Sequence, residues 1–321
     1  MIKHNTFIRL STSTLLLAMT GLSTNIICTP PIQAHHTQSH KATIAQTKPL
    51  VIVFPARGEA TDARRKADAV AKFLSKELNI PVQAIVSDET AAVEALRANR
   101  ADVAFLSGRA ALKAEQLAGS KLVLAEIRPN YSGGHTYKSV LVVKKNSPLT
   151  PRASAKLTLA QLKGKRMAFA SRTSGSGFIV PTGEFVSKGF VSSSDRYNEF
   201  FSQVTYGDGY SSALQAVLRG QADVGAVSEY ALASPYIKPE EVSQLRVLYS
   251  IPGVPAHGIS IDDDVSPEMR IKITNALLKL NAPANNNLLR DLGNATQLVK
   301  VDHKKHLNVM RQALKKANIE P

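Results

Sequence analysis

One segment occurs twice in this chain, and the repeat restricts the folds that the sequence can adopt. Residues 95–107 align with residues 216–228 without a gap. Each copy has the pattern of the end of an amphipathic helix, a polar turn and a short buried strand that ends in serine. One copy in each half of the chain predicts two similar α/β lobes. The identical pairs are Ala95 and Ala216, Ala101 and Ala222, Asp102 and Asp223, Val103 and Val224, and Ser107 and Ser228.

Apolar runs of strand length alternate with amphipathic runs of helix length around the repeat. The alternation predicts βα units and a mostly parallel sheet. A β-branched run at 139–145 is expected to cross into the second lobe and a run at 244–250 to return, so that the two crossings form a hinge. The predicted strands of the first lobe are 50–54, 82–87, 102–106 and 122–127, and the predicted helices packed on it are 63–78, 90–98, 109–118, 267–280 and 304–317.

The predicted fold class is α/β, a two-lobed clamshell with two interlobe crossings. A chain of 321 residues that is 44% hydrophobic can bury the cores of two domains. We expect lobe I over 49–142 and lobe II over 143–248, and we expect 249–321 to return to lobe I.

The amino-terminal residues 1–34 have the pattern of a secretory signal peptide. A basic start precedes a short apolar stretch, and a cleavage site is expected after Ala34. The apolar stretch is too short and too interrupted by polar residues for a membrane anchor. Residues 35–48 are polar and aperiodic and are predicted to form a flexible leader. We expect a periplasmic or other extracytoplasmic protein, with lipidation at Cys28 as the alternative to cleavage after Ala34.

The formal net charge of +15 raises the question of a nucleic-acid partner. The Lys and Arg residues are scattered, Trp is absent and no stacking aromatics are interleaved with the basic residues, so this partner is not expected. A positive field instead favours small anions. No histidine lies beside a nucleophile, and His257, His303 and His306 lack metal-site spacing with carboxylates. We predict neither an enzyme nor a cofactor or metal site.

A loop of hydroxyls and glycines at 171–181 is the strongest candidate for a binding site. A short apolar strand, 166–170, runs into the loop, and an apolar pattern that could open a helix resumes at Gly177. Free amides and hydroxyls at a helix start attract a small oxyanion. An ordinary strand-to-helix turn is the alternative. A P-loop is excluded because Phe178 follows Gly177, and a nucleophile elbow is excluded because position 174 is serine.

The serines that end the repeated strands are the next candidates. Ligands of open α/β sheets bind outside the carboxyl ends of strands, so Ser107 and Ser228 are expected to face the cleft between the lobes. Both serines equally suit a structural role. For Asp102 and Asp223, capping of a backbone group is the favoured interpretation.

Several motifs resemble those of the periplasmic phosphate/phosphite/phosphonate-binding proteins of ABC transporters. The resemblance extends from Leu50 to about Ala313 and is specific at Leu-Lys-Gly-Lys (162–165) and at the Ser/Gly loop (174–177). It implies a type II periplasmic binding protein fold. It also implies that Ser174, Ser176 and the amides of the loop, Gly175 and Gly177 included, hold a phosphorus oxyanion.

The chain departs from the family pattern at four positions. Two family tyrosines fall on Thr90 and Ala111, a histidine falls on Tyr210, and the middle threonine of Ser-Thr-Ser is Gly175. The identity of the oxyanion is therefore open. Further candidates are arginines that could supply charge-assisted bonds, donors of lobe I, and an acidic residue that could meet an amino group. They are Arg57, Arg109 and Arg172, then Ser107, Thr90 and Tyr137, and finally Glu229.

These observations favour a receptor that closes on phosphate, phosphite or a phosphonate and delivers it to an ABC permease in the membrane. The receptor is expected to be a monomer. A sensor subunit that binds the same anion but acts in signalling remains the alternative.

Overall fold

The computed structural model describes residues 48–56 and 60–321. The predicted signal peptide, nearly all of the predicted leader, Cys28 and Arg57 lie outside these residues. No helix among the described residues has the length and apolar character needed to cross a membrane.

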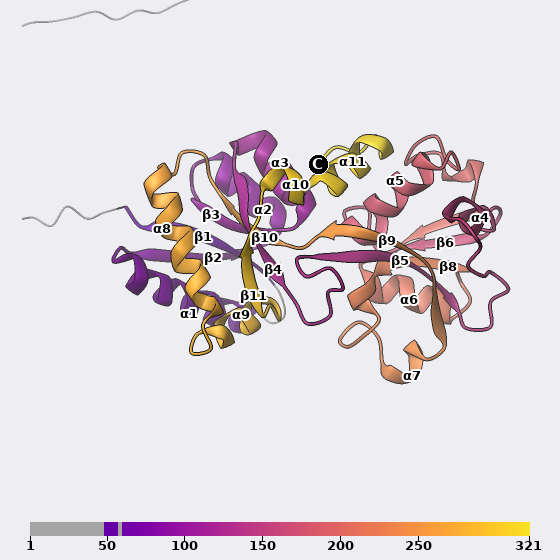
Figure 1. The fold of residues 1–321 in the computed structure, drawn as a ribbon, viewed down its shortest axis with the longest axis horizontal. Coiled ribbons are helices and arrows are strands. Elements are labelled where there is room, and N and C mark those ends of the chain that lie inside the picture. The colour runs from indigo at the N-terminus through magenta and orange to yellow at the C-terminus, as the bar shows by residue number, and fades with distance from the viewer. Residues whose placement is uncertain (1–47, 57–59) are drawn as a thin grey trace, which may run out of the picture. The chain divides into compact units, whose positions relative to one another are not determined.

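The first lobe contains a six-stranded mixed sheet, drawn at the left of Figure 1. β1 pairs in parallel with β2 and β3, whereas β10 is antiparallel to both of its neighbours, β3 and β4. Two successive antiparallel pairings restore the direction, so β1, β3 and β4 end at the same edge. The sheet order is β11 (Gln297–Lys300), β4 (Lys121–Ile127), β10 (Gly258–Ile261), β3 (Val103–Leu106), β1 (Leu50–Pro55) and β2 (Val82–Ser87).

The second lobe contains a five-stranded mixed sheet, at the right of Figure 1. β6, β7 and β8 run parallel, and β5 is antiparallel to β8 and β9. Its order is β7 (Gln203–Tyr206), β6 (Arg166–Phe169), β8 (Val224–Ser228), β5 (Thr136–Lys144) and β9 (Leu245–Pro255). The prediction of a mostly parallel sheet is therefore only partly right. Four strands of each sheet share one direction, but β10 and β11 oppose them in the first sheet and β5 opposes them in the second.

The two connecting strands lie wholly in the second sheet. β5 pairs with β9 from Thr136 opposite Pro255 to Lys144 opposite Leu245. The expected lobe boundaries at 142/143 and 248/249 therefore fall inside strands, and the chain changes sheet before Thr136 and after Pro255. The periodicity located the strands but could not show which sheet they join.

Helices cover both sheets, and the predicted helices 63–78, 90–98, 109–118 and 267–280 are present within a few residues of their expected bounds. Those of the first lobe are α1 (Ala60–Leu78), α2 (Glu89–Arg97), α3 (Gly108–Ala118), α8 (Pro267–Leu278) and α9 (Asn286–Gly293). Those of the second are α4 (Ala155–Ala160), α5 (Val180–Ser187), α6 (Tyr210–Leu218) and α7 (Pro239–Val242). Both copies of the repeat form the predicted helix end, turn and strand, as α2–β3 and α6–β8.

The repeated aspartates have the predicted structural role. Asp102 Oδ2 accepts a hydrogen bond from the amide of Val51 at 2.7 Å. Asp223 Oδ2 accepts from the amide of Arg166 at 2.8 Å, in the second lobe. Each carboxylate thus satisfies a backbone donor of the strand next to its own.

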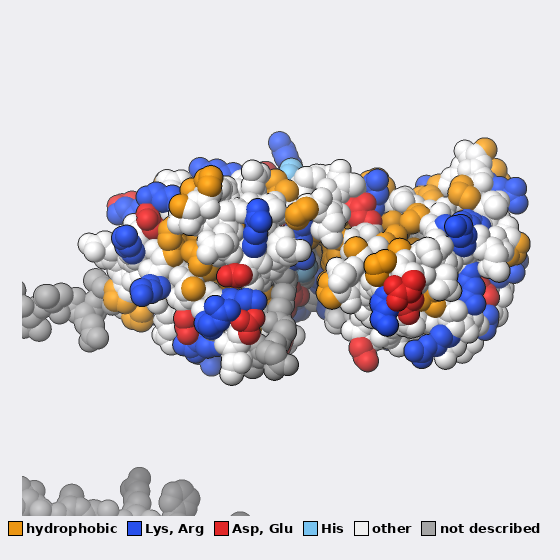
Figure 2. Space-filling view, turned by 90° about the horizontal axis from the view of Figure 1, so that it is seen from below, with side chains coloured by type: hydrophobic (Ala, Val, Ile, Leu, Met, Phe, Trp, Pro, Cys, Tyr) orange, Lys and Arg blue, Asp and Glu red, His pale blue; other side chains and the backbone are white. Residues whose placement is uncertain are grey.

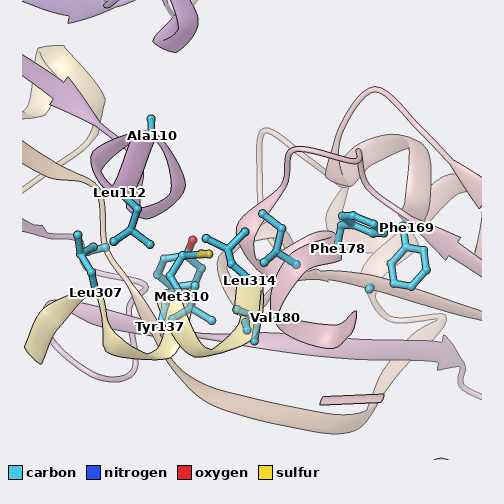
Figure 3. Packing of buried hydrophobic residues seen from close by; sticks show 14 of the residues in the cluster. Ala110, Leu112, Tyr137, Phe169, Phe178, Val180, Leu307, Met310 and Leu314 are labelled. Carbon is cyan, nitrogen blue, oxygen red and sulfur yellow. The ribbon is translucent and has the colours of Figure 1, made fainter. Parts of the chain in front are cut away.

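The sequence suggested that the last helix packs on the first lobe alone, and this expectation is wrong. The segment forms two helices, α10 (His303–His306) and α11 (Asn308–Ala317), and α11 contacts both lobes. Figure 3 shows Met310 and Leu314 of α11 between Leu112 of α3 and Val180 of α5. α11 lies very close to α5, since a Cβ on Gly183 would stand 2.8 Å from the Cα of Ala313. This glycine lets α11 join the two lobes in one apolar cluster.

Candidate functional site

A cleft of about 640 Å³ lies where strand ends of both sheets face each other. This position agrees with the rule that ligands of α/β sheets bind beyond the carboxyl ends of strands. From lobe I it is lined by residues that follow β1 to β4: Pro55, Ala56, Asp88, Glu89, Ser107, Gly108, Arg109 and Arg128. From lobe II come residues that follow β6, β7 and β8, namely Ser171, Thr173, Ser174, Gly175, Gly209, Tyr210 and Tyr230, together with Tyr137 of β5.

The Ser/Gly loop forms the start of a helix at this cleft. Ser174 caps a π-helical turn, Gly175–Ile179, that continues into α5, and its Oγ accepts from the amide of Gly177 at 3.0 Å. No described residue accepts from the amides of Gly175 and Ser176, which are the first two of the helix. These amides and the positive end of the helix favour an anion beside Ser174 and Gly175.

Gly177 has a packing role in place of the predicted contact with ligand. Its amide is occupied by Ser174 Oγ, and it does not line the cleft. A Cβ at this position would lie 2.5 Å from the Cβ of Ala170. Glycine is needed here so that the loop can lie against the strand it follows.

Ser176 lies behind the cleft wall. The residue is fully buried, and its Oγ is 2.8 Å from the hydroxyl of Tyr210. Its carbonyl accepts from Ser139 Oγ at 2.6 Å. Tyr210, which the sequence suggested as a replacement for the family histidine, is the residue that lines the cleft, and Ser176 orients it.

Tyrosines form much of the cleft wall, including two that the sequence did not reveal, Tyr230 and Tyr236. The ring of Tyr230 lies 5.1 Å from that of Tyr137 and 5.6 Å from that of Tyr210, centroid to centroid. Burial raises the pKa of Tyr137 and of Tyr230 well above the usual value, so both hydroxyls stay neutral donors at physiological pH. The tyrosines lost at Thr90 and Ala111 are thus replaced from other elements.

Ser107 lines the cleft as predicted, but its hydrogen-bonding groups already have partners. Its amide and its Oγ donate to the carboxylate of Glu89, at 2.6 and 2.7 Å, and the same Oγ caps α3. Glu89, which follows β2, is a cleft residue that sequence reasoning missed. Thr90 beside it is exposed and lies outside the lining.

Ser228 and Glu229 also lie outside the lining. Ser228 is fully buried, and its Oγ has no hydrogen-bond partner among the described residues. Glu229 Oε1 accepts from the amide and Oγ of Ser132, at 3.1 and 2.8 Å, and from the amide of Lys138 at 3.0 Å. Glu229 therefore holds the segment between the lobes in place.

The arginines differ in their relation to the cleft. Arg109 lines it and donates from Nη2 to the carbonyl of Glu320 at 3.3 Å, whereas its buried Nε has no partner among the described residues. Arg172 lies outside the lining, with its guanidinium 3.9 Å from the ring centroid of Tyr206. Arg128 lines the cleft and was missed; its position directly after β4 is the one signal that could have indicated it.

Basic side chains are spread over both lobes on the face seen in Figure 2 and form no continuous stripe of the kind that tracks nucleic acid. The described residues contain no group of three or more His, Cys, Asp or Glu that could hold a metal ion. The cleft lining combines hydroxyl and amide donors and two arginines with the carboxylates of Asp88 and Glu89.

The fold is that of the type II periplasmic binding proteins, so the predicted fold class is confirmed. The sequence profile of the family described as ABC transporter, phosphonate, periplasmic substrate-binding protein matches residues 52–306. The chain belongs to this family, which is one of solute-binding proteins, and the resemblance seen in the sequence is confirmed.

Individual relatives agree with this assignment. The phosphonates-binding periplasmic protein of Escherichia coli K12 is 27% identical over 202 residues. These residues make up 62% of this chain and 56% of the length of that relative. PhnD1 from Prochlorococcus marinus, solved in complex with methylphosphonate, has a TM-score of 0.64 at 22% identity, over 84% of this chain and 99% of its own. A binding protein component of an ABC phosphonate transporter from Pseudomonas aeruginosa has a TM-score of 0.62 at 20% identity, over 84% and 87% of the two chains.

Proposed function

We propose that this protein captures a small phosphorus oxyanion, that is phosphate, phosphite or a phosphonate, in the cleft and delivers it to an ABC permease. The observation that carries the proposal is the pair of amides of Gly175 and Ser176, which have no acceptor among the described residues, at a helix start that borders the cleft. Such a start binds anions without a catalytic group.

The donors around the helix start suit a tetrahedral oxyanion. The Tyr210 hydroxyl lines the same cleft and lies 3.3 Å from the hydroxyl of Tyr230, so two hydroxyls adjoin the two amides. Hydroxyls also accept hydrogen bonds, and a partly protonated phosphorus anion can donate one. Sulfate carries no proton at neutral pH. The arrangement therefore favours the phosphorus anion over sulfate.

Ligand donors from both lobes give a reason for closure. Arg109 on lobe I and Ser174 with Gly175 on lobe II line the same cleft, and one small anion can use both sides fully only if they approach. Closure is the signal that a permease would recognise. The predicted signal peptide places this action outside the cytoplasm, with a lipid anchor on Cys28 as the alternative to a free protein, and a monomer suffices.

The contacts of Glu229 refine which organic phosphonate fits. Glu229 lies outside the cleft lining and holds Ser132 and Lys138 through Oε1, so it is not expected to meet the amino group suggested from the sequence. An aminoalkyl substituent would instead extend towards Asp88 on lobe I, an exposed carboxylate in the cleft lining.

A thermal-shift panel followed by calorimetry tests the proposal. A ligand that binds only the folded protein raises its melting temperature. We expect a rise with one or more of phosphate, phosphite, methylphosphonate and aminoethylphosphonate, and a smaller rise or none with sulfate. Heat of binding from an amino acid or a sugar, with none from any phosphorus anion at millimolar concentration, would show that the proposal is wrong.

A further inference from the structure

Arg128 lies where the first lobe meets the donors of the second. It follows β4, at the sheet edge where β1 and β3 also end, and it lines the cleft. Its guanidinium carbon is 5.6 Å from the ring centroid of Tyr131 and 6.0 Å from that of Tyr230. The Tyr230 hydroxyl is 3.3 Å from that of Tyr210. Tyr230 thus lies between the guanidinium of Arg128 and the hydroxyl of Tyr210, one of the proposed anion donors.

Glu126 balances the charge of Arg128 without satisfying its donors. Oε1 of Glu126 lies 2.8 Å from Nη2 of Arg128, and the two side chains are 9% and 11% exposed. Nevertheless, neither Nε nor Nη2 makes a properly directed hydrogen bond to any described residue. The same Oε1 accepts from the Tyr131 hydroxyl at 3.0 Å and lies 3.8 Å from Nδ1 of His257. Unused donors on a buried cation are costly unless an acceptor arrives.

The carboxylates that line the cleft do not compete for these donors. Glu89 accepts from the amide and Oγ of Ser107, and Asp88 Oδ1 accepts from the amide of Ala91 at 2.9 Å. Both carboxylates therefore bond groups of lobe I other than Arg128. Nε and Nη2 of Arg128 are buried and lack a hydrogen-bond partner among the described residues, so an anion in the cleft can accept from them once the guanidinium turns towards it.

We infer that Arg128 binds the ligand directly, as a lobe I cation that pairs with the charge of the phosphorus anion. This inference rests on the proposed function and names a further contact residue of that same site. The guanidinium turns from Glu126 towards the oxygens of the anion, to which it can donate two parallel hydrogen bonds. Glu126 is then a competitor of the ligand.

Two single variants distinguish this role from that of a structural ion pair. Arg128→Gln should weaken binding of methylphosphonate and of inorganic phosphate about 10- to 100-fold, the usual range for a lost charge-assisted bond. Glu126→Gln should tighten the binding of both, because the competitor is gone while an amide oxygen remains for Tyr131. A structural pair would make both variants weaken binding or leave both unchanged. Either result, measured by calorimetry, overturns the inference.

Controls separate folding effects from failure of the proposed function. Arg128→Gln leaves Glu126 buried and unpaired, so the double variant Glu126→Gln/Arg128→Gln is measured as well, and it should bind as weakly as the single variant. Arg166→Gln breaks an ion pair of the same 2.8 Å length, with Asp223, outside the cleft lining, and should leave affinity unchanged. If the double variant binds like the wild type, the proposed role of Arg128 is overturned, while the proposed function stands. If the wild-type protein binds neither probe, the variants are measured with phosphite and aminoethylphosphonate, and absence of binding to all four anions overturns the proposed function.

Discussion

Replacement of Tyr210 by phenylalanine removes one hydroxyl from the cleft and leaves the ring in place. That hydroxyl lies 2.8 Å from Ser176 Oγ and 3.3 Å from the hydroxyl of Tyr230. A hydrogen bond to a charged ligand contributes about 1.5 to 3 kcal/mol, so we expect the dissociation constant for the bound phosphorus anion to rise roughly 10- to 150-fold. The free energy of unfolding should fall by about 1 kcal/mol, because buried Ser176 loses a partner. Calorimetry and urea denaturation measure the two effects.

Ser176→Ala is the matched comparison. Its hydroxyl bonds Tyr210 behind the wall, so its removal should lower stability by a similar amount and raise the dissociation constant by less than about tenfold. Tyr249→Phe serves as a control, because its hydroxyl donates to Glu184 at 2.7 Å outside the cleft lining. It should reduce stability alone. Wild-type affinity in Tyr210→Phe, or a larger loss of affinity in Ser176→Ala than in Tyr210→Phe, would refute this assignment.

Two further predictions concern pH and closure. Asp262 is 1% exposed, its Oδ2 has no partner among the described residues, and burial raises its pKa from 3.8 to about 6. The folded state then holds the proton of Asp262 more tightly than the unfolded state, so this group lowers stability progressively from about pH 4 to pH 6. The free energy of unfolding of Asp262→Asn, relative to that of the wild type, should therefore grow over this window by at most about 3 kcal/mol. Parallel curves of unfolding free energy against pH for the two proteins would contradict this prediction. Saturating ligand should reduce the radius of gyration and protect the amides of Gly175 and Ser176 from hydrogen exchange, and an unchanged radius together with unchanged exchange would argue against a closing receptor.

Local pattern predicted the elements, and long-range pairing decided their arrangement. The amphipathic period placed α1, α2 and α3 and their strands within a few residues, because each depends on its own side chains. β10 and β11 are short and were not predicted, yet β10 separates β3 from β4 and makes the sheet mixed. Nothing in the residues of β3 shows which strand will pair with it. The same limit explains the shifted lobe boundaries within β5 and β9.

Part of the site followed from sequence position and part did not. Ser107, Arg109, Tyr137, Ser174, Gly175 and Tyr210 line one cleft, as expected of residues near strand ends or in a helix-start loop. Arg128, Glu89 and Tyr230 were missed, although each also follows a strand. Nothing in their local sequence separates them from the other Arg, Glu and Tyr residues of the chain, so only the meeting of the two lobes reveals them. Tyr230, for example, lines the cleft together with Tyr137 and Tyr210, which are distant from it in the sequence.

The repeated serines show why a duplication predicts a fold better than a site. Ser107 and Ser228 occupy the same position of the two copies, and each ends a strand. After Ser107 the helix α3 begins at once, so the serine caps it and remains at the cleft. After Ser228 a 3-10 turn, Glu229–Ala231, follows, and Ser139 of β5 lies directly opposite in the sheet. Ser228 is covered, and Tyr230 takes the place at the cleft. The strand was repeated, but the residue exposed at its end depends on what the chain does next.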